Sequence, residues 1–310
     1  MSRLSGSVTL VLQVIARVPA KINLLLAVGP VRPDGFHELA TVFHAVSLYD
    51  EVTGSSDDGV SVTLGGPYGT RAPDGDENLA VLAARALARR ARPARPPGVR
   101  LGIHKEIPVA SGLAGGSADA AGALLVCNQL WGLRLSDARL AIVAASLGSD
   151  VPFSLTGGTA VGTGRGERLR PVPVGGPLHW VLAFADGELS TPQVYRRLDE
   201  LRAERSAPVP PPAVPDDVLA ALAAVDAPAL AGLLHNDLQE AALALRPSLS
   251  DTLRAGDELG ALAGLVSGSG PTCAFLARDD AHAAALASGL AESGTCAGAV
   301  AVVGPAPLGT

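Results

Sequence analysis

Pro108-Val-Ala-Ser-Gly-Leu-Ala-Gly-Gly-Ser-Ala118 lies between a predicted strand and a predicted helix, and its small residues are the most informative pattern in the chain. Apolar alternation predicts the strand over residues 99–105, and an alanine-rich stretch predicts the helix over residues 119–131. Closely spaced glycines before a helix let backbone N–H groups approach phosphate oxygens, and the helix end adds partial positive charge. A helix start that needs small residues for close packing has the same pattern, so the loop alone leaves both interpretations open.

The loop differs from two common nucleotide-binding motifs. No lysine follows its last glycine, so the P-loop pattern GxxxxGK[ST] fails. Its glycines at 112, 115 and 116 do not fit the dinucleotide-binding pattern GxGxxG.

The other elements are predicted from apolar periodicity and turn residues. Before the loop we expect one or two strands over residues 8–28, with a break near Pro19, further strands over 41–52 and 59–64, and a helix over 77–92. After it we expect a helix over 136–147, a hairpin over 159–172 and a strand over 179–185. The last part is expected to hold helices over 216–225, 227–245 and 250–259, a strand segment over 265–276, a helix over 280–291 and a strand over 295–303.

Composition excludes several classes of protein. Of the 310 residues, 48% are hydrophobic and 17% charged, which is typical of a globular chain and not of a disordered one. The longest uncharged stretch, residues 259–277, is interrupted by a small polar loop and does not resemble a membrane-spanning helix. Gln13 interrupts the apolar residues 8–15, so a first strand is favoured there over a signal peptide.

Charge and cysteine content suggest the surroundings. A net charge of -6 gives no general attraction to nucleic acid or anionic lipid. A basic run lacks interleaved aromatic residues, so a solvated face is favoured over nucleic-acid binding; it contains Arg89, Arg90, Arg92, Arg95 and Arg100. Three cysteines without CxxC spacing favour a reducing compartment, and we expect the cytoplasm.

Only two of the 24 basic residues are lysines, Lys21 and Lys105. Lys21 lies inside an apolar strand, where a compact ammonium is a different chemical choice from a guanidinium. A lysine that extends from an edge strand to water is the alternative. Asp150 is flanked by apolar residues and could be an ordinary turn residue after a helix. Together they make chemical sense, because an ammonium keeps a nearby carboxylate ionised and able to accept a proton. Lys105 receives no role beyond the end of its strand.

Other chemical motifs are few. Residues 267–272 form a second small-residue loop that could approach a ligand through its backbone, or could be an ordinary turn. The six histidines show no HExxH or similar metal spacing, and no G-x-S-x-G sequence indicates a serine hydrolase.

Three segments in order resemble the motifs of the GHMP small-molecule kinases, and the match spans nearly the whole chain. They are Pro19-Ala-Lys-Ile-Asn-Leu24, the loop 108–118 and Ser267-Gly-Ser-Gly-Pro-Thr-Cys273. Four further segments are similar to the GHMP kinases that act on 4-diphosphocytidyl-2-C-methyl-D-erythritol, rather than to mevalonate, galactose or homoserine kinases: Arg32-Pro-Asp-Gly-Phe-His-Glu-Leu39, Leu147-Gly-Ser-Asp-Val-Pro-Phe153, Gly162-Thr-Gly-Arg-Gly-Glu167 and His235-Asn-Asp-Leu238.

The resemblance implies transfer of the γ-phosphoryl group of ATP to the 2-hydroxyl of that substrate, in the non-mevalonate isoprenoid pathway. It implies that Asp150 is the general base and that Lys21 holds both reacting groups and offsets developing charge. ATP phosphates would lie on the amides of one loop: Pro108, Val109, Ala110, Ser111, Gly112, Leu113, Ala114, Gly115, Gly116, Ser117 and Ala118. Mg²⁺ would accompany ATP; its ligands are not fixed, with Ser117 as the candidate.

The resemblance also implies contacts to the bases. Phe36 would stack on cytosine, His37 would hydrogen-bond to it, and Tyr195 would supply the opposite stacking face. Asn23 would bind substrate, and Asn78 would contact adenine.

Three residues depart from the family pattern. Phe36 stands where the family usually has tyrosine; this keeps a stacking face and loses one hydroxyl. Ala114 and Ala118 stand where glycine and serine are common. Alanine at a positive φ costs on the order of 1 kcal/mol, so we expect an ordinary φ at Ala114.

The expected architecture is two α+β domains with the active site in the cleft between them. Residues 1–173 would form a mixed α/β domain that binds ATP and carries the catalytic residues, and residues 174–310 a ferredoxin-like domain. We expect a small-molecule substrate, no nucleic acid or membrane partner, and a monomer or homodimer. The alternatives are another GHMP kinase, such as one for homoserine or mevalonate, and a catalytically silent member that binds nucleotide.

Overall fold

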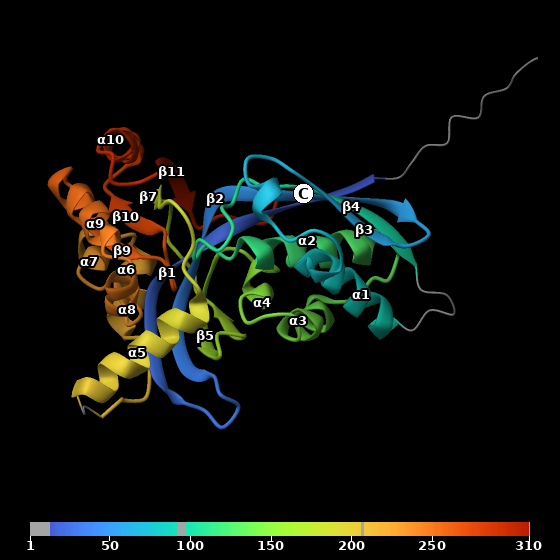
Figure 1. Cartoon of the computed structure of the whole chain (residues 1–310), viewed down its shortest axis with the longest axis horizontal. Helices are drawn as coiled ribbons and strands as arrows, with labels where there is room; N and C mark the ends of the chain where they lie inside the picture. Colours follow the sequence, from blue (N-terminus) through green and yellow to red (C-terminus); the bar gives the residue numbers. More distant parts are fainter. Residues whose placement is uncertain (1–12, 92–96, 206–207, 310) are drawn as a thin grey trace, which may run out of the picture.

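The computed structural model describes residues 13–91, 97–205 and 208–309. The predicted start of the first strand at residues 8–12 lies outside this part of the chain, as do Arg92 and Arg95 of the basic run. Within the described residues, the strands form one seven-stranded sheet and one four-stranded sheet; in Figure 1 the smaller sheet lies at the left, and the larger sheet extends from beside it to the right.

Two long antiparallel strands form the centre of the larger sheet. They are β1 (Gln13–Val31) and β2 (His37–Asp57). The sheet order is β3-β4-β2-β1-β8, and β5 pairs with the first part of β2 and with β6. The remaining bounds are β3 (Val60–Gly65), β4 (Gly98–His104), β5 (Thr159–Gly164), β6 (Arg168–Pro171) and β8 (His235–Asn236). The predicted break near Pro19 is wrong: β1 continues through it, with a register shift between Pro19 and Ala20.

Helices cover one face of this sheet (Figure 1). They are α1 (Leu79–Ala91), α2 (Gly115–Leu130), α3 (Asp137–Ala145) and α4 (Val151–Ser154); two single 3₁₀ turns, Gly69–Arg71 and Gly75–Glu77, precede α1. Small residues let α2 press on the strands: a Cβ at Gly122 would lie 2.5 Å from a methyl of Val52. The alanine-rich composition of this helix therefore reflects close packing on β2.

The smaller sheet has the order β11-β7-β10-β9, with every neighbouring pair antiparallel. Its strands are β7 (Leu178–Phe184), β9 (Ala263–Val266), β10 (Cys273–Ala277) and β11 (Gly298–Gly304). Numbered along the chain, this order is fourth, first, third, second, which is the ferredoxin-like arrangement. Its helices are α5 (Thr191–Arg205), α6 (Asp216–Ala224), α7 (Ala227–Ala231), α8 (Gln239–Leu245), α9 (Ser248–Glu258) and α10 (Asp280–Glu292). The predicted fold class is confirmed.

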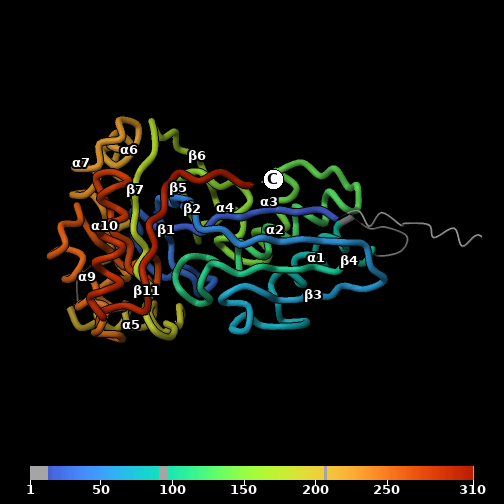
Figure 2. Tube along the Cα trace, turned by 90° about the horizontal axis from the view of Figure 1, so that it is seen from above, coloured from blue at the N-terminus to red at the C-terminus, as the bar shows by residue number. Residues whose placement is uncertain are grey.

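Two segments from the last part of the chain return to the larger sheet. Strand β8 pairs in parallel with Leu25 and Leu26 of β1. After β11 the chain runs back along β1, where Gly309 and Arg17 exchange backbone hydrogen bonds of 2.9 and 3.0 Å (Figure 2). The predicted boundary after residue 173 falls between β6 and β7 and stays a prediction.

Two other predicted elements are wrong. The helix expected over residues 227–245 is interrupted, because His235 and Asn236 pair with β1. The strand expected over 265–276 is two strands around the loop 267–272.

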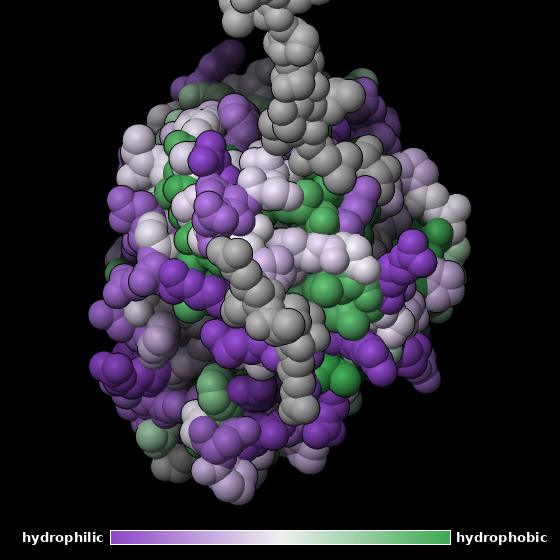
Figure 3. Space-filling view, turned by 90° about the vertical axis from the view of Figure 1, so that its right-hand side faces the viewer, coloured by the Kyte–Doolittle hydropathy of each residue, from purple (hydrophilic) through white to green (hydrophobic). Residues whose placement is uncertain are grey.

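Three arginines of the basic run lie in the described part of the chain. Arg89, Arg90 and Arg100 are exposed, and Arg100 pairs with Asp57. Figure 3 shows the end of the molecule on the α1 side as a mosaic of hydrophilic side chains with small hydrophobic patches between them. Among the described helices, none is both long and apolar enough to cross a membrane.

Candidate active site

Lys21 lies in the middle of β1 and is only 5% exposed. Its ammonium donates to Oδ1 of Asn23 at 2.8 Å and to the carbonyl of Gly112 at 3.0 Å. Asn23 is held in turn, because its Nδ2 donates to Oγ1 of Thr41 at 2.8 Å. The ammonium is therefore fixed against the glycine loop and does not extend to water.

Asp150 approaches the same ammonium, with 3.7 Å between Oδ2 of Asp150 and Nζ of Lys21. It directly precedes the short helix α4, five residues after α3 ends at Ala145. Its side chain makes no capping hydrogen bond and is about a third exposed (34%). The carboxylate is thus open to a reacting group, and the structure brings together the two predicted catalytic residues.

The glycine loop meets the second small-residue loop beside Lys21. Oγ of Ser267 donates to the carbonyl of Gly112 at 3.2 Å. A Cβ at Gly112, where φ is +81°, would lie 2.2 Å from the carbonyl oxygen of Ser267. A Cβ at Gly268 would lie 3.2 Å from Nζ of Lys21. Residues 267–272 are therefore a structural part of this site and not an isolated turn.

There is open space beside the backbone at the start of α2. A Cβ at Gly116 would meet nothing within 4 Å, and Ser117 follows it in the first helical turn. Ala118 is fully buried in α2.

The expectation of an ordinary φ at Ala114 is wrong. Ala114 has φ 60° and ψ 32°, the left-handed conformation, directly before α2. The chain must turn there from the loop into the helix, and alanine adopts this conformation at a cost on the order of 1 kcal/mol. Ala110, earlier in the same loop, also has a positive φ of 51°.

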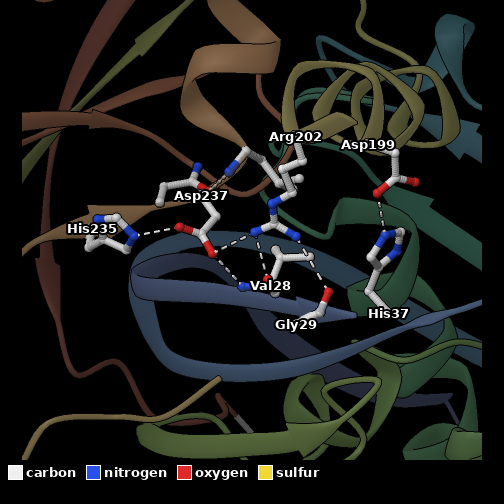
Figure 4. A network of polar contacts seen from close by, with 9 residues as sticks. Val28, Gly29, His37, Asp199, Arg202, His235 and Asp237 are labelled. Atoms are coloured by element: carbon white, nitrogen blue, oxygen red, sulfur yellow. Dashed lines mark hydrogen bonds and ion pairs between the residues drawn. The ribbon is translucent and has the colours of Figure 1, made fainter. Parts of the chain in front are cut away.

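A cluster of rings lies where β2 begins. Nε2 of His37 is 2.8 Å from Oδ1 of Asp199 on α5 (Figure 4), and its ring lies 5.0 Å from that of Tyr195 at a tilt of 34°. Phe36 is half exposed (50%), and the Arg165 guanidinium lies 4.8 Å from its ring centre. Burial and then the charge of Asp150 raise the pKa of Tyr195 well above its usual value. Tyr195 therefore belongs to the ring cluster through its contact with His37.

Asn78 has a local role. It is buried, its Nδ2 donates to the carbonyl of Pro73 at 2.7 Å, and its Oδ1 accepts from the amide of Ala80 at 2.9 Å. Its adenine contact stays a prediction. Within residues 13–91, 97–205 and 208–309, no group of three or more His, Cys, Asp or Glu side chains could hold a metal ion.

Sequence reasoning missed the function of the segment 235–238. Nδ2 of Asn236 donates to the carbonyls of Val266 and Gly268, at 2.8 and 2.7 Å, and so fixes the second loop. Asp237 accepts from the amide of Val28 at 2.7 Å and from Arg202 at 3.2 Å, as Figure 4 shows. The segment therefore connects β1, α5 and the loop beside Lys21.

A buried ion cluster at Lys105 was also missed by sequence reasoning. Nζ of Lys105 donates to Asp50 at 2.5 Å and to Asp119 at 2.7 Å. The available signals were a lysine in a chain that otherwise uses arginine, and an aspartate within an alanine-rich helix.

Comparison with known proteins identifies the family. GHMP kinase N-terminal and C-terminal domains match residues 78–158 and 218–296. The chain is 57% identical to a 4-diphosphocytidyl-2-C-methyl-D-erythritol kinase of Streptomyces avermitilis over 299 residues, 96% of this chain and 99% of the relative. A crystal structure of 4-(cytidine 5'-diphospho)-2C-methyl-D-erythritol kinase is 34% identical with a TM-score of 0.75, over 96% of this chain and 100% of that one.

An L. major mevalonate kinase shares the fold alone, at 16% identity and a TM-score of 0.72 over 97% of this chain and 98% of that one. High identity over nearly full length thus points to one branch of the superfamily. The chain belongs to the 4-diphosphocytidyl-2-C-methyl-D-erythritol kinase family of GHMP kinases.

Proposed function

We propose that this protein transfers the γ-phosphoryl group of ATP to the 2-hydroxyl of 4-diphosphocytidyl-2-C-methyl-D-erythritol, giving the 2-phosphate and ADP. The observation that carries the proposal is the Lys21–Asp150 pair at 3.7 Å, with Lys21 bonded to the carbonyl of Gly112. Membership of the family supplies the identity of the alcohol.

In the proposed reaction, Asp150 accepts the proton of the 2-hydroxyl. The oxygen then forms a bond to the γ-phosphorus, the bond from that phosphorus to the bridging oxygen breaks, and its electron pair leaves with ADP. Lys21 pairs with Asp150 and offsets the charge on the transferred group. Positioning and electrostatics of this kind supply most of the catalysis in phosphoryl transfer.

The start of α2 fits the phosphates of ATP. Gly116 leaves open space beside the backbone, and the amides of the first turn of this 16-residue helix have no partners within the helix. Mg²⁺ usually keeps several waters and binds phosphates together with one or two protein groups. The Ser117 hydroxyl is the candidate protein contact, and Mg²⁺ would neutralise phosphate charge.

We assign the ring cluster to cytosine. The half-exposed face of Phe36 is available for stacking, His37 for a hydrogen bond, and Tyr195 for a second face. The side chain of Asn23 is hydrogen-bonded to Lys21 and to Thr41. We therefore expect Asn23 to position Lys21 beside the substrate, in addition to binding the substrate itself. Nothing in this assignment requires a nucleic acid or membrane partner; we expect a cytoplasmic monomer or homodimer.

A coupled ADP-release assay against a panel of alcohols tests the proposal. We expect ADP release with 4-diphosphocytidyl-2-C-methyl-D-erythritol and background rates with homoserine and mevalonate. Turnover of homoserine or mevalonate alone would establish another GHMP kinase. Nucleotide binding without turnover of any alcohol would establish a silent member, against which the paired Lys21 and Asp150 argue.

A further inference from the structure

Three charged side chains are buried beneath the start of α2. Lys105 follows β4 and is 1% exposed, Asp50 lies in β2 at 0%, and Asp119 lies in the second turn of α2 at 3%. The Lys105 ammonium joins both carboxylates, at 2.5 Å to Asp50 and 2.7 Å to Asp119. We call these residues the Lys105 cluster. They connect three elements that are distant in sequence.

The cluster holds the entry to the glycine loop. Oδ1 of Asp50 accepts from the amide of Glu106 at 2.7 Å and from that of Ile107 at 2.9 Å, directly before Pro108. The backbone of Lys105 also packs closely against that of Gly66. A Cβ at Gly66 would lie only 2.6 Å from the carbonyl oxygen of Lys105. The chain therefore enters the loop in one orientation.

The same cluster holds the exit. Asp119 belongs to α2 itself, and a Cβ at Gly115, the first residue of α2, would lie 3.3 Å from Nζ of Lys105. The first turn of α2 thus rests directly over the ammonium. Both ends of the loop are fixed by one set of ionic contacts.

The net charge of the Lys105 cluster affects how strongly a polyanion can bind at the start of α2. Two ionised carboxylates and one ammonium would leave net negative charge under the start of α2. Burial, and then the charge of Asp50, raise the pKa of Asp119 to about 7 against the opposing effect of Lys105. Asp119 therefore holds a proton more readily than an ordinary carboxyl, which lowers the negative charge beneath the start of α2.

Stability alone is a weak reason for such a cluster. Replacing a buried ion pair by apolar residues of similar volume is often neutral or stabilising. A cluster that fixes both ends of a loop has a second use, which is to keep the amides of that loop in the orientation that a ligand requires.

We propose that Lys105, Asp50 and Asp119 are positioning residues that set the backbone of the loop 108–116 for the triphosphate of ATP. The proposal rests on the proposed function. It assigns the cluster to ATP and not to the alcohol substrate, so the two Michaelis constants should respond differently to its removal.

The principal test is a neutral triple variant, Asp50→Asn, Lys105→Met and Asp119→Leu. The Asp50→Asn change keeps a side-chain oxygen for the two backbone amides, while the charges are gone. We expect a folded protein whose KM for ATP rises at least about tenfold, equivalent to roughly 1.4 kcal/mol. The KM for the alcohol should stay within twofold. A folded triple variant with an unchanged KM for ATP would overturn the proposal, and so would failure to fold, because the cluster would then be a requirement of the fold.

Asp119→Asn is the conservative variant. It keeps an oxygen that can accept from Lys105, so the KM for ATP should rise by less than about threefold, close to the wild-type value. A rise as large as that of the triple variant would contradict the assignment of Lys105 as the central group.

Phe275→Leu is the matched control for a loss of stability. Phe275 is fully buried in β10, in the core of the smaller sheet. This variant should lower Tm without changing either KM. If it raised the KM for ATP as the triple variant does, the effect would be one of stability only.

Calorimetric titration with ATP alone separates this proposal from the proposed function. Wild-type protein that binds ATP but phosphorylates no alcohol would refute the function and leave the cluster testable by binding. Weaker ATP binding by the triple variant is the expected result, and equal binding contradicts the inference.

Discussion

The ammonium of Lys21 lies 3.7 Å from the carboxylate of Asp150 and 3.0 Å from the carbonyl of Gly112. One side chain thus connects an open carboxylate with the loop proposed to hold phosphates. This relationship motivates the first two predictions.

Asp150→Ala should remove the proton acceptor and leave the nucleotide site intact. We expect kcat to fall by about 10²–10⁴-fold, the usual contribution of a general base. Steady-state kinetics measures the loss, and calorimetry should show ATP affinity within about threefold of wild type. Near-normal kcat would exclude Asp150 as the base.

Lys21→Arg should also be poorly active, although it preserves the charge. The Nζ atom is enclosed by Asn23, Gly112 and Gly268, and a planar guanidinium is larger than the ammonium that fits there. We expect kcat to fall by about 100-fold or more, equivalent to roughly 2.7 kcal/mol. Circular dichroism verifies the fold. Full activity would mean that the arrangement around the ammonium is unimportant.

Gly116→Ala should separate stability from ATP binding. Alanine stabilises a helix by about 1 kcal/mol relative to glycine, and no atom lies within 4 Å of the new methyl group. If the phosphates of ATP occupy that space, the KM for ATP should rise roughly tenfold, equivalent to about 1.4 kcal/mol, while Tm stays the same or increases.

Gly298→Ala in β11 is the matched control, because its Cβ also meets nothing within 4 Å. It should leave both KM values unchanged. An unchanged KM for ATP in Gly116→Ala would place the phosphates elsewhere.

His44 should make the free energy of unfolding depend on pH. It is fully buried, its Nδ1 lies 2.8 Å from Oγ1 of Thr159, and its Nε2 has no hydrogen-bond partner in the described chain. Burial lowers the pKa of His44 from 6.5 to about 3. The unfolded chain therefore binds the proton first, and the stability present above pH 6.5 is lost as the pH falls towards 3.

Denaturant titrations of wild type and His44→Gln at pH 7 and pH 5 measure this effect. The wild type should lose roughly 2 kcal/mol more than the variant over that interval, at about 1.36 kcal/mol per pH unit below 6.5. Equal losses would show that His44 is not held neutral.

Local patterns predicted most of the fold. Apolar periodicity predicted the strands of both sheets except β8, and the order of glycines and small residues located the loop before α2. Lys21 and Asp150 could be paired before the structure because each was chemically unusual in its own segment. The resemblance to the GHMP kinases then assigned both residues to one reaction.

The errors and omissions come from contacts between distant segments. The helix expected over 227–245 is broken because His235 and Asn236 pair with β1, which no local pattern contains. Ala114 adopts a positive φ because the loop must join α2 there. The partners of Lys105 lie 55 and 14 residues away, so only the fold shows that they meet.

Lys21 and Asp150 are proposed to transfer phosphate to one alcohol. The most direct measurement is ³¹P NMR of wild-type protein with ATP, Mg²⁺ and 4-diphosphocytidyl-2-C-methyl-D-erythritol, beside Asp150→Ala. We predict a new phosphomonoester signal that grows in equal amount with ADP, and its absence with the variant over the same time. ADP formed without a phosphomonoester, or the same signal at the same rate from Asp150→Ala, would contradict the claim.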